Sequence, residues 1–211
     1  MVYASEIDKK KFTFQVSGKL WNRSLVMRDI ETGSLWSHIL GECMDGELKG
    51  KKLDLIPSVM STWKEWLAAN PDTTVLDMRP TADRFGKGFY RSAKKFVYGV
   101  KVNGSPKAYS FPFLKDNPIV QEAVGGVPVL ITFDPESTAA MIFNRGARKF
   151  KPELEGGRLI EVPTGASFDP LTGIGDRGED LPQLNGIISY RKAWLVFYPE
   201  STVAEVPTSV R

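Results

Sequence analysis

The chain has 211 residues, of which 42% are hydrophobic and 25% charged, and its formal net charge is +3. This balance is that of a globular protein and excludes a largely disordered chain. No apolar run reaches the roughly 20 residues that cross a bilayer, so we expect a soluble chain with no transmembrane segment. The N-terminal residues MVYASEIDKKKFTF lack the apolar core of a signal peptide.

Charge and residue usage narrow the expected partners. Basic residues form short runs at 9–11, 49–52 and 145–151, and acidic residues separate these runs. A nucleic-acid-binding surface gathers basic charge on one face, so solvated turns are the favoured interpretation and no nucleic acid is expected. Cys43 is the only cysteine and His38 the only histidine. Neither an intrachain disulfide nor a cysteine-rich zinc site can therefore form.

The first third of the chain predicts several strands followed by one helix. Residues 12–18 (FTFQVSG) alternate apolar and polar positions, and the further strand candidates are Ser24–Asp29, 34–40 and 52–56. Residues 62–71 (TWKEWLAANP) predict a helix that ends before Pro71. Trp63, Trp66 and Leu67 lie three and four residues apart, which predicts an apolar stripe packed against a sheet.

A polar, glycine-containing stretch at 77–95 is interpreted as a linker, and the strand patterns resume after it. Residues 95–111 predict a hairpin with Asn103-Gly104 at its turn. Residues 120–129 (VQEAVGGVPV) predict a tight turn before a buried strand, and 128–135 with 139–145 predict another pair of strands. A second helix is expected around Trp194, with Tyr190, Trp194 and Phe197 facing the sheet.

Two parts of the chain resemble each other. Shifted by 128 places, WLAANPDTTV at 66–75 lies over WLVFYPESTV at 194–203. Shifted by 132, ETGSLWSHILGECMDG at 31–46 lies over PTGASFDPLTGIGDRG at 163–178, and shifted by 140, residues 1–3 lie over 141–143. The blocks keep their order while the shift falls steadily, which indicates an internal duplication.

The predicted architecture is therefore a β-dominated α+β fold made of two related strand-rich halves, each ending in a short helix. The first repeat covers 1–76, the linker 77–95 and the second repeat 96–211, and the two repeats are expected to pack as one compact domain. The second repeat has upstream strands with no counterpart before Met1. We therefore expect the first repeat to begin partway through its unit.

The combination of motifs resembles a prokaryotic family known as domain of unknown function 3179. The resemblance rests on the Val-Ser-Gly turn at 16–18, the block from Asp29 to Trp36, the glycines at 41, 46 and 50, and the Trp63/Trp66/Pro71 ending, and it extends more weakly over the rest of the chain. The resemblance implies that longer members carry a Cys-Pro-Leu-Cys segment just before the point where this chain starts, and that many relatives are exported. The second repeat has Asp134-Pro135-Glu136-Ser137 in the equivalent place.

Ligand binding is predicted for a polar and aromatic block together with two arginines. Asp29, Thr32, Ser34 and Trp36 form the block, although Asp and Thr beside a glycine are also ordinary turn formers. Arg28 and Arg145 are the candidates for holding an anionic group through two hydrogen bonds, with a surface ion pair as the simpler alternative.

His38 and Cys43 are the candidate metal ligands or nucleophile–base pair, with copper or zinc as the metal. Two ligands do not complete a site, so a structural role for both residues is favoured. The set of nucleophile, base and orienting group that a reaction requires is not visible. The sequence therefore favours a non-catalytic binding or scaffold module for a small ligand or protein partner. The alternative is a metal-handling protein or enzyme whose site lies between the repeats.

Overall fold

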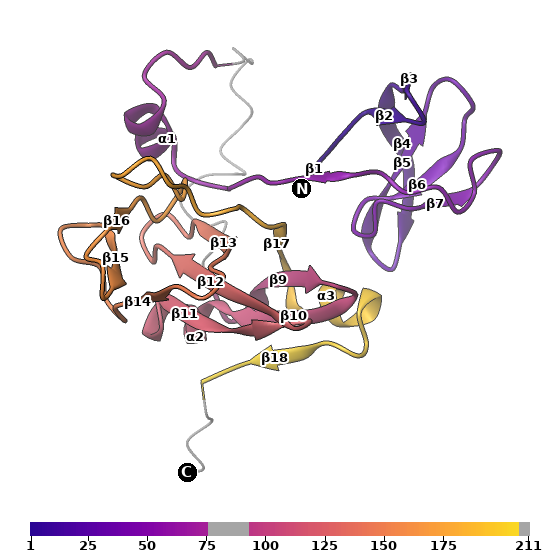
Figure 1. Ribbon diagram of the computed structural model, residues 1–211. Helices are drawn as coiled ribbons and strands as arrows, with labels where there is room; N and C mark the ends of the chain where they lie inside the picture. The colour runs from indigo at the N-terminus through magenta and orange to yellow at the C-terminus, as the bar shows by residue number, and fades with distance from the viewer. Residues whose placement is uncertain (76–92, 207–211) are drawn as a thin grey trace, which may run out of the picture.

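The computed structural model describes residues 1–75 and 93–206, and strands account for most of the regular structure (Figure 1). The prediction of a β-dominated α+β fold is confirmed. No helix among the described residues is long and apolar enough to cross a membrane. The predicted linker lies outside the described residues, except for the 3-10 turn η2 (Ala93–Lys95) at its end.

The first third of the chain forms small antiparallel sheets and one helix. β1 (Val2–Tyr3) pairs with β8 (Leu55–Ile56), and β2 (Glu6–Ile7) pairs with β3 (Lys10–Lys11). The order of the four-stranded sheet is β4 (Phe14–Trp21), β5 (Ser24–Asp29), β6 (Leu35–Ser37), β7 (Cys43–Asp45). The helix α1 (Trp63–Ala69) follows where TWKEWLAANP predicts it.

The remainder of the chain is built on three sheets. The largest has the order β17 (Gly186–Tyr190), β9 (Phe96–Val102), β10 (Ser105–Ser110), β18 (Thr202–Ala204), with only the β10–β18 pair parallel. The second consists of β11 (Ile119–Val124), β12 (Val127–Phe133) and β13 (Ala140–Asn144), and the third of β14 (Lys149–Phe150), β15 (Leu159–Val162) and β16 (Ser167–Phe168). Two helices, α2 (Phe111–Asp116) and α3 (Arg191–Phe197), complete this part.

The predicted hairpin at 95–111 is confirmed as β9–β10, and its turn explains why. Asn103 and Gly104 have φ of 46° and 80°, the left-handed values that a two-residue turn of this kind requires. Ser110 then caps α2, because its hydroxyl accepts a hydrogen bond from the Phe113 N–H at 3.3 Å. The hairpin is thereby joined to a helix that the sequence patterns do not indicate.

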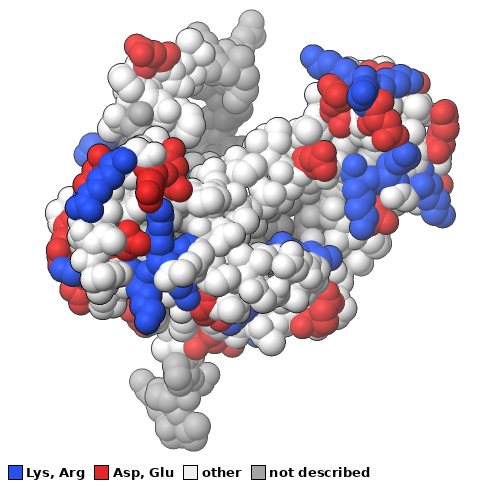
Figure 2. Space-filling view, in the orientation of Figure 1, with Lys and Arg blue, Asp and Glu red and all other residues white. Residues whose placement is uncertain are grey.

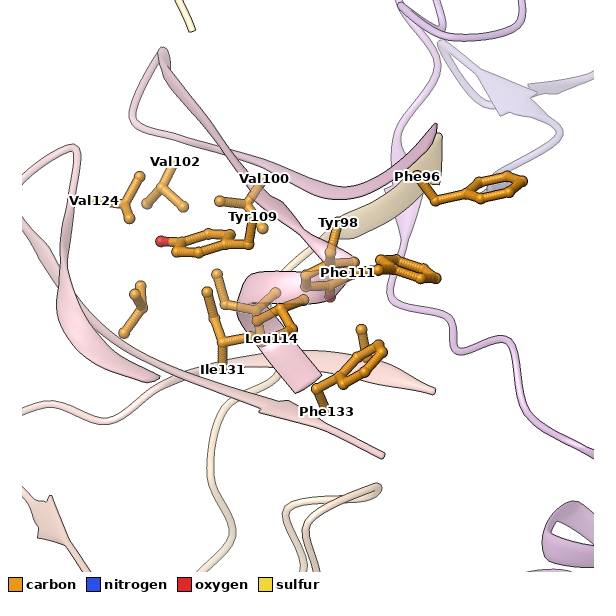
Figure 3. Packing of buried hydrophobic residues seen from close by; sticks show 13 residues of the cluster. Phe96, Tyr98, Val100, Val102, Tyr109, Phe111, Leu114, Val124, Ile131 and Phe133 are labelled. Atoms are coloured by element: carbon orange, nitrogen blue, oxygen red, sulfur yellow. The ribbon is translucent and has the colours of Figure 1, made fainter. Parts of the chain in front are cut away.

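The main core lies between the β9–β10 hairpin, α2 and the β11–β13 sheet. Tyr98 of β9 and Phe111 of α2 point toward Ile131 and Phe133 of β12 (Figure 3). A second apolar cluster joins the two halves, where Ile39 of the first packs with Val97 and Trp194 of the second. The tip of the β4–β5 hairpin adds an edge-to-face contact between the Trp21 and Phe197 rings, whose centroids are 5.0 Å apart.

The prediction that α1 buries an apolar stripe against a sheet is wrong. Trp63 is 50% exposed, and Trp66 and Leu67 are each 39% exposed. The corresponding Trp194 in α3 is 1% exposed and packs on β9 as predicted, whereas Tyr190 is half exposed and stacks on Phe96. The apolar spacing identifies one face of a helix but does not provide the sheet that would cover it.

Candidate functional site

A cavity of about 460 Å³ lies at the end of the β12–β13 hairpin. Its walls come from segments far apart in sequence: the start of β11, the β12–β13 loop, and the loops after β14 and β16. The apolar part of the lining includes Ile119, Phe133, Ala139, Met141, Leu154 and Leu171. A cavity of this size with mainly apolar walls is typical of small-molecule sites.

The loop at this cavity, 134–139, is held in shape by Asp134. One carboxylate oxygen accepts the Glu136 N–H at 3.1 Å, and the other accepts the Ser137 N–H at 3.0 Å and the Ser137 hydroxyl. The Ser137 hydroxyl in turn accepts the Ala139 N–H at 3.2 Å. Hydrogen bonds within the loop therefore form an Asx-type turn that fixes the polar end of the cavity.

A second bond fixes the opposite wall. The Thr132 hydroxyl donates to the Pro170 carbonyl at 2.7 Å, which joins β12 to the loop after β16. The polar groups that line the cavity are the carboxylates of Asp134 and Glu153 and the hydroxyls of Thr132 and Ser137. Two carboxylates beside an apolar wall suit a ligand that has a hydrogen-bond donor or a positive charge at one end.

The predicted ligand-binding block does come together, but its side chains satisfy one another. Asp29 is fully buried, and its carboxylate accepts the Trp36 Nε1–H at 2.8 Å and the Thr32 N–H and hydroxyl at 2.6 and 2.8 Å. The Thr32 and Ser34 hydroxyls share a hydrogen bond of 2.6 Å. Burial alone would raise the pKa of Asp29, but these bonds and the Gly33 N–H outweigh it and lower the pKa. The block closes the β5–β6 turn.

The two predicted arginines lie in different parts of the molecule. Arg28 is exposed on β5, and Arg145 directly follows β13. Figure 1 shows β5 and β13 on opposite sides of the molecule. The Nη1 atom of Arg145 donates to the Arg148 carbonyl at 2.6 Å and to the Gly146 carbonyl at 3.3 Å. The Nε atom of Arg145 is buried and has no hydrogen-bond partner within residues 1–75 and 93–206. The structure therefore does not combine Arg145 with the Asp29 block in one site.

His38 and Cys43 lie on either side of the turn between β6 and β7. Cys43 is buried beside Trp36 in the core of the first half, and burial raises the pKa of its thiol. Burial also lowers the pKa of His38, and the positive N-terminus lowers it further. In the part of the chain that the structure describes, no group of three or more His, Cys, Asp or Glu side chains could hold a metal ion. The copper or zinc site stays a prediction.

Comparison with known proteins bears on the N-terminal part of the chain. Residues 1–95 match the family described as "Protein of unknown function (DUF3179)". This match confirms the resemblance predicted from the motifs between 16 and 73. No curated protein and no solved structure gives a significant match. The DUF3179 match covers the Asp29 block and α1 but ends before the cavity.

Sequence reasoning missed the cavity residues. The sequence signal nearest to them is Asp134-Pro135-Glu136-Ser137, a polar break between two apolar strands. Ile119, Leu154 and Leu171 carry no shared pattern, because they meet only when three separate loops converge. Such a site is formed by tertiary structure rather than by a local motif.

Proposed function

We propose that this chain is a non-catalytic binding module whose ligand occupies the cavity at the end of the β12–β13 hairpin. The single observation that supports this function is the cavity itself: about 460 Å³, mostly apolar, with Asp134 and Glu153 among its few polar groups. The ligand class that fits is a small, largely apolar molecule with a donor or cationic group.

The apolar half of the proposal is tested with N-phenyl-1-naphthylamine, a fluorescent apolar amine. Leu154 lines the cavity and is 42% exposed, so Leu154→Ser removes apolar wall at little risk to the fold. Ile174 is 55% exposed and does not line the cavity, which makes Ile174→Ser the matched control. We expect saturable probe binding that weakens about tenfold in Leu154→Ser, since the lost contact area is worth about 1–2 kcal/mol. Equal affinities in the two variants would place the probe elsewhere.

The polar half is tested by displacing the probe with decylamine and with decanoate, which share an alkyl chain but differ in charge. The acidic lining predicts displacement at a lower concentration of decylamine. Glu153→Gln should reduce this preference, whereas Glu205→Gln, in the ion pair with Arg191, should not. If decanoate displaces the probe as well as decylamine does, the proposed ligand class is wrong.

A further inference from the structure

The chain contains two helix endings with the same sequence pattern and the same internal contacts. In α1 the Trp66 carbonyl accepts the Asn70 N–H at 2.8 Å, and the Trp66 Nε1–H donates to the Thr73 hydroxyl at 3.1 Å. In α3 the Trp194 carbonyl accepts the Tyr198 N–H at 2.8 Å, and the Trp194 Nε1–H donates to the Ser201 hydroxyl at 2.7 Å. The two tryptophans are therefore held in the same local geometry.

Only one of these tryptophans is covered. The Trp194 ring lies directly on Gly99 of β9: a Cβ placed on Gly99 would be 2.4 Å from the ring. Val97 of β9 and Ala108 of β10 complete the apolar surface around it. The β9–β10 hairpin thus accommodates a Trp-Leu helix face because a glycine leaves space for the indole and small apolar residues surround it.

The face of α1 lies in a different environment. Trp63, Trp66 and Leu67 are exposed by 50%, 39% and 39%, and they share one side of the helix. Residues 1–75 include no hairpin of the β9–β10 kind beside α1, and Figure 1 places α1 far from that hairpin. Large apolar side chains that are exposed side by side, rather than singly, mark an interaction surface.

We propose that the Trp63/Trp66/Leu67 face of α1 is a docking surface for a partner polypeptide that presents a β-hairpin of the β9–β10 kind. The partner's hairpin has a glycine where the Trp66 ring lands and Val or Ala residues around it, as β9–β10 has for Trp194. This surface is separate from the cavity, whose lining includes no residue of α1. The two proposals can therefore fail independently.

The test uses the full chain and a synthetic peptide with the sequence of residues 96–111, closed into a hairpin by a disulfide between added terminal cysteines. Binding is measured by isothermal titration calorimetry. We expect saturable binding with one peptide per chain. A peptide carrying Gly99→Val should bind at least tenfold more weakly, because the added side chain would occupy the space of the indole.

Variants of the chain locate the surface. Trp66→Ala should weaken peptide binding at least tenfold. Leu67→Asp, a second substitution at an exposed position, should weaken it by at least the same factor. Trp21→Ala is the matched control, because Trp21 is also 39% exposed but lies on the β4–β5 hairpin. No binding, or binding that Gly99→Val and Trp66→Ala leave unchanged, would overturn the proposal. So would a dimer of the free chain that Trp66→Ala dissociates, since a second copy would then cover this face.

Discussion

At the scale of single residues, Asp29 and Glu161 show how one turn is stabilised in two ways. The carboxylate of Asp29 is buried because the Trp36 indole N–H needs an acceptor. The position that a shift of 132 residues aligns with Trp36 holds Phe168, whose ring has no N–H to satisfy. Glu161 instead accepts the Thr164 hydroxyl at 2.7 Å and pairs with Arg148 at 3.6 Å. The acid beside Trp36 therefore serves the fold of the first half.

Asp29→Asn should destabilise the chain by about 1–3 kcal/mol at pH 7, since the amide cannot accept every hydrogen bond that the carboxylate accepts. The pKa of Asp29 is lower in the folded chain than in the unfolded one. Its contribution is therefore fully present above the unfolded value of about 3.9 and is lost as the pH falls through the folded value. Urea unfolding at pH 7 and at pH 3 measures this. If the difference in free energy of unfolding between wild type and Asp29→Asn is as large at pH 3 as at pH 7, the prediction is contradicted.

At the scale of elements, corresponding contacts recur in the two halves. Gly33 N–H donates to the Asp29 carbonyl at 3.1 Å, and Gly165 N–H to the Glu161 carbonyl at 3.0 Å. Two further backbone hydrogen bonds recur. In the first half the Gly41 N–H donates to the Ser37 carbonyl and the Leu53 N–H to the Gly41 carbonyl. In the second half the Gly173 N–H donates to the Asp169 carbonyl and the Leu181 N–H to the Gly173 carbonyl. These contacts support our proposal that the halves arose by duplication of one unit.

A paired glycine substitution tests this correspondence. Gly41 and Gly173 have φ of 63° and 76°, and a Cβ on either would lie 2.6 Å from an aromatic ring, that of Tyr3 or Phe143. Gly18 and Gly165 also have positive φ, but no atom would contact their Cβ. Alanine at all four sites incurs backbone strain of about 1–2 kcal/mol. We expect Gly41→Ala and Gly173→Ala to lower the free energy of unfolding further than their controls do. If only one of Gly41→Ala and Gly173→Ala lowers the free energy of unfolding further than its control does, the two glycines do not have equivalent roles.

The tryptophans of the two helices are predicted to contribute differently to the stability of the chain, even though the helices share a sequence pattern. Trp194→Ala should lower the free energy of unfolding by about 3–5 kcal/mol, because it empties a buried position on β9. Trp66→Ala should cost less than about 1 kcal/mol in the isolated chain, because the ring is already partly exposed. Thermal and urea unfolding of the two variants gives the comparison. Equal losses would mean that the α1 face is covered in solution.

At the scale of the whole molecule, the sequence predicts the secondary-structure elements better than the tertiary contacts between them. The strand Ser24–Asp29, the Asn103-Gly104 turn and both tryptophan helices are found where the patterns predict them, because period-two and period-3.6 patterns and turn chemistry are local. The cavity and the exposure of α1 depend on which distant loops and sheets come together. The residue types of the Asp29 block mark it as a candidate site in the sequence. Only the folded structure shows that its side chains form hydrogen bonds with one another.

On the face shown in Figure 2, charges of the two signs are mixed rather than separated. Figure 2 shows basic and acidic side chains side by side over β4–β7 and around β14–β16, with uncharged surface between these regions. The ion pairs of the molecule include Lys151 with Glu155 and Lys51 with Asp8, both at 2.6 Å. The face shown in Figure 2 therefore carries charges of both signs rather than one continuous basic patch.

The central claim, a ligand in the β12–β13 cavity, is tested most directly by NMR of the chain labelled with ¹³C at its methionine methyl groups. Met141 lines the cavity and is buried, whereas Met27 and Met44 lie in the β4–β7 sheet. On titration with N-phenyl-1-naphthylamine, we predict that the Met141 methyl resonance shifts to saturation while those of Met27 and Met44 stay in place. A Met141 resonance that does not move as the probe saturates would contradict this account.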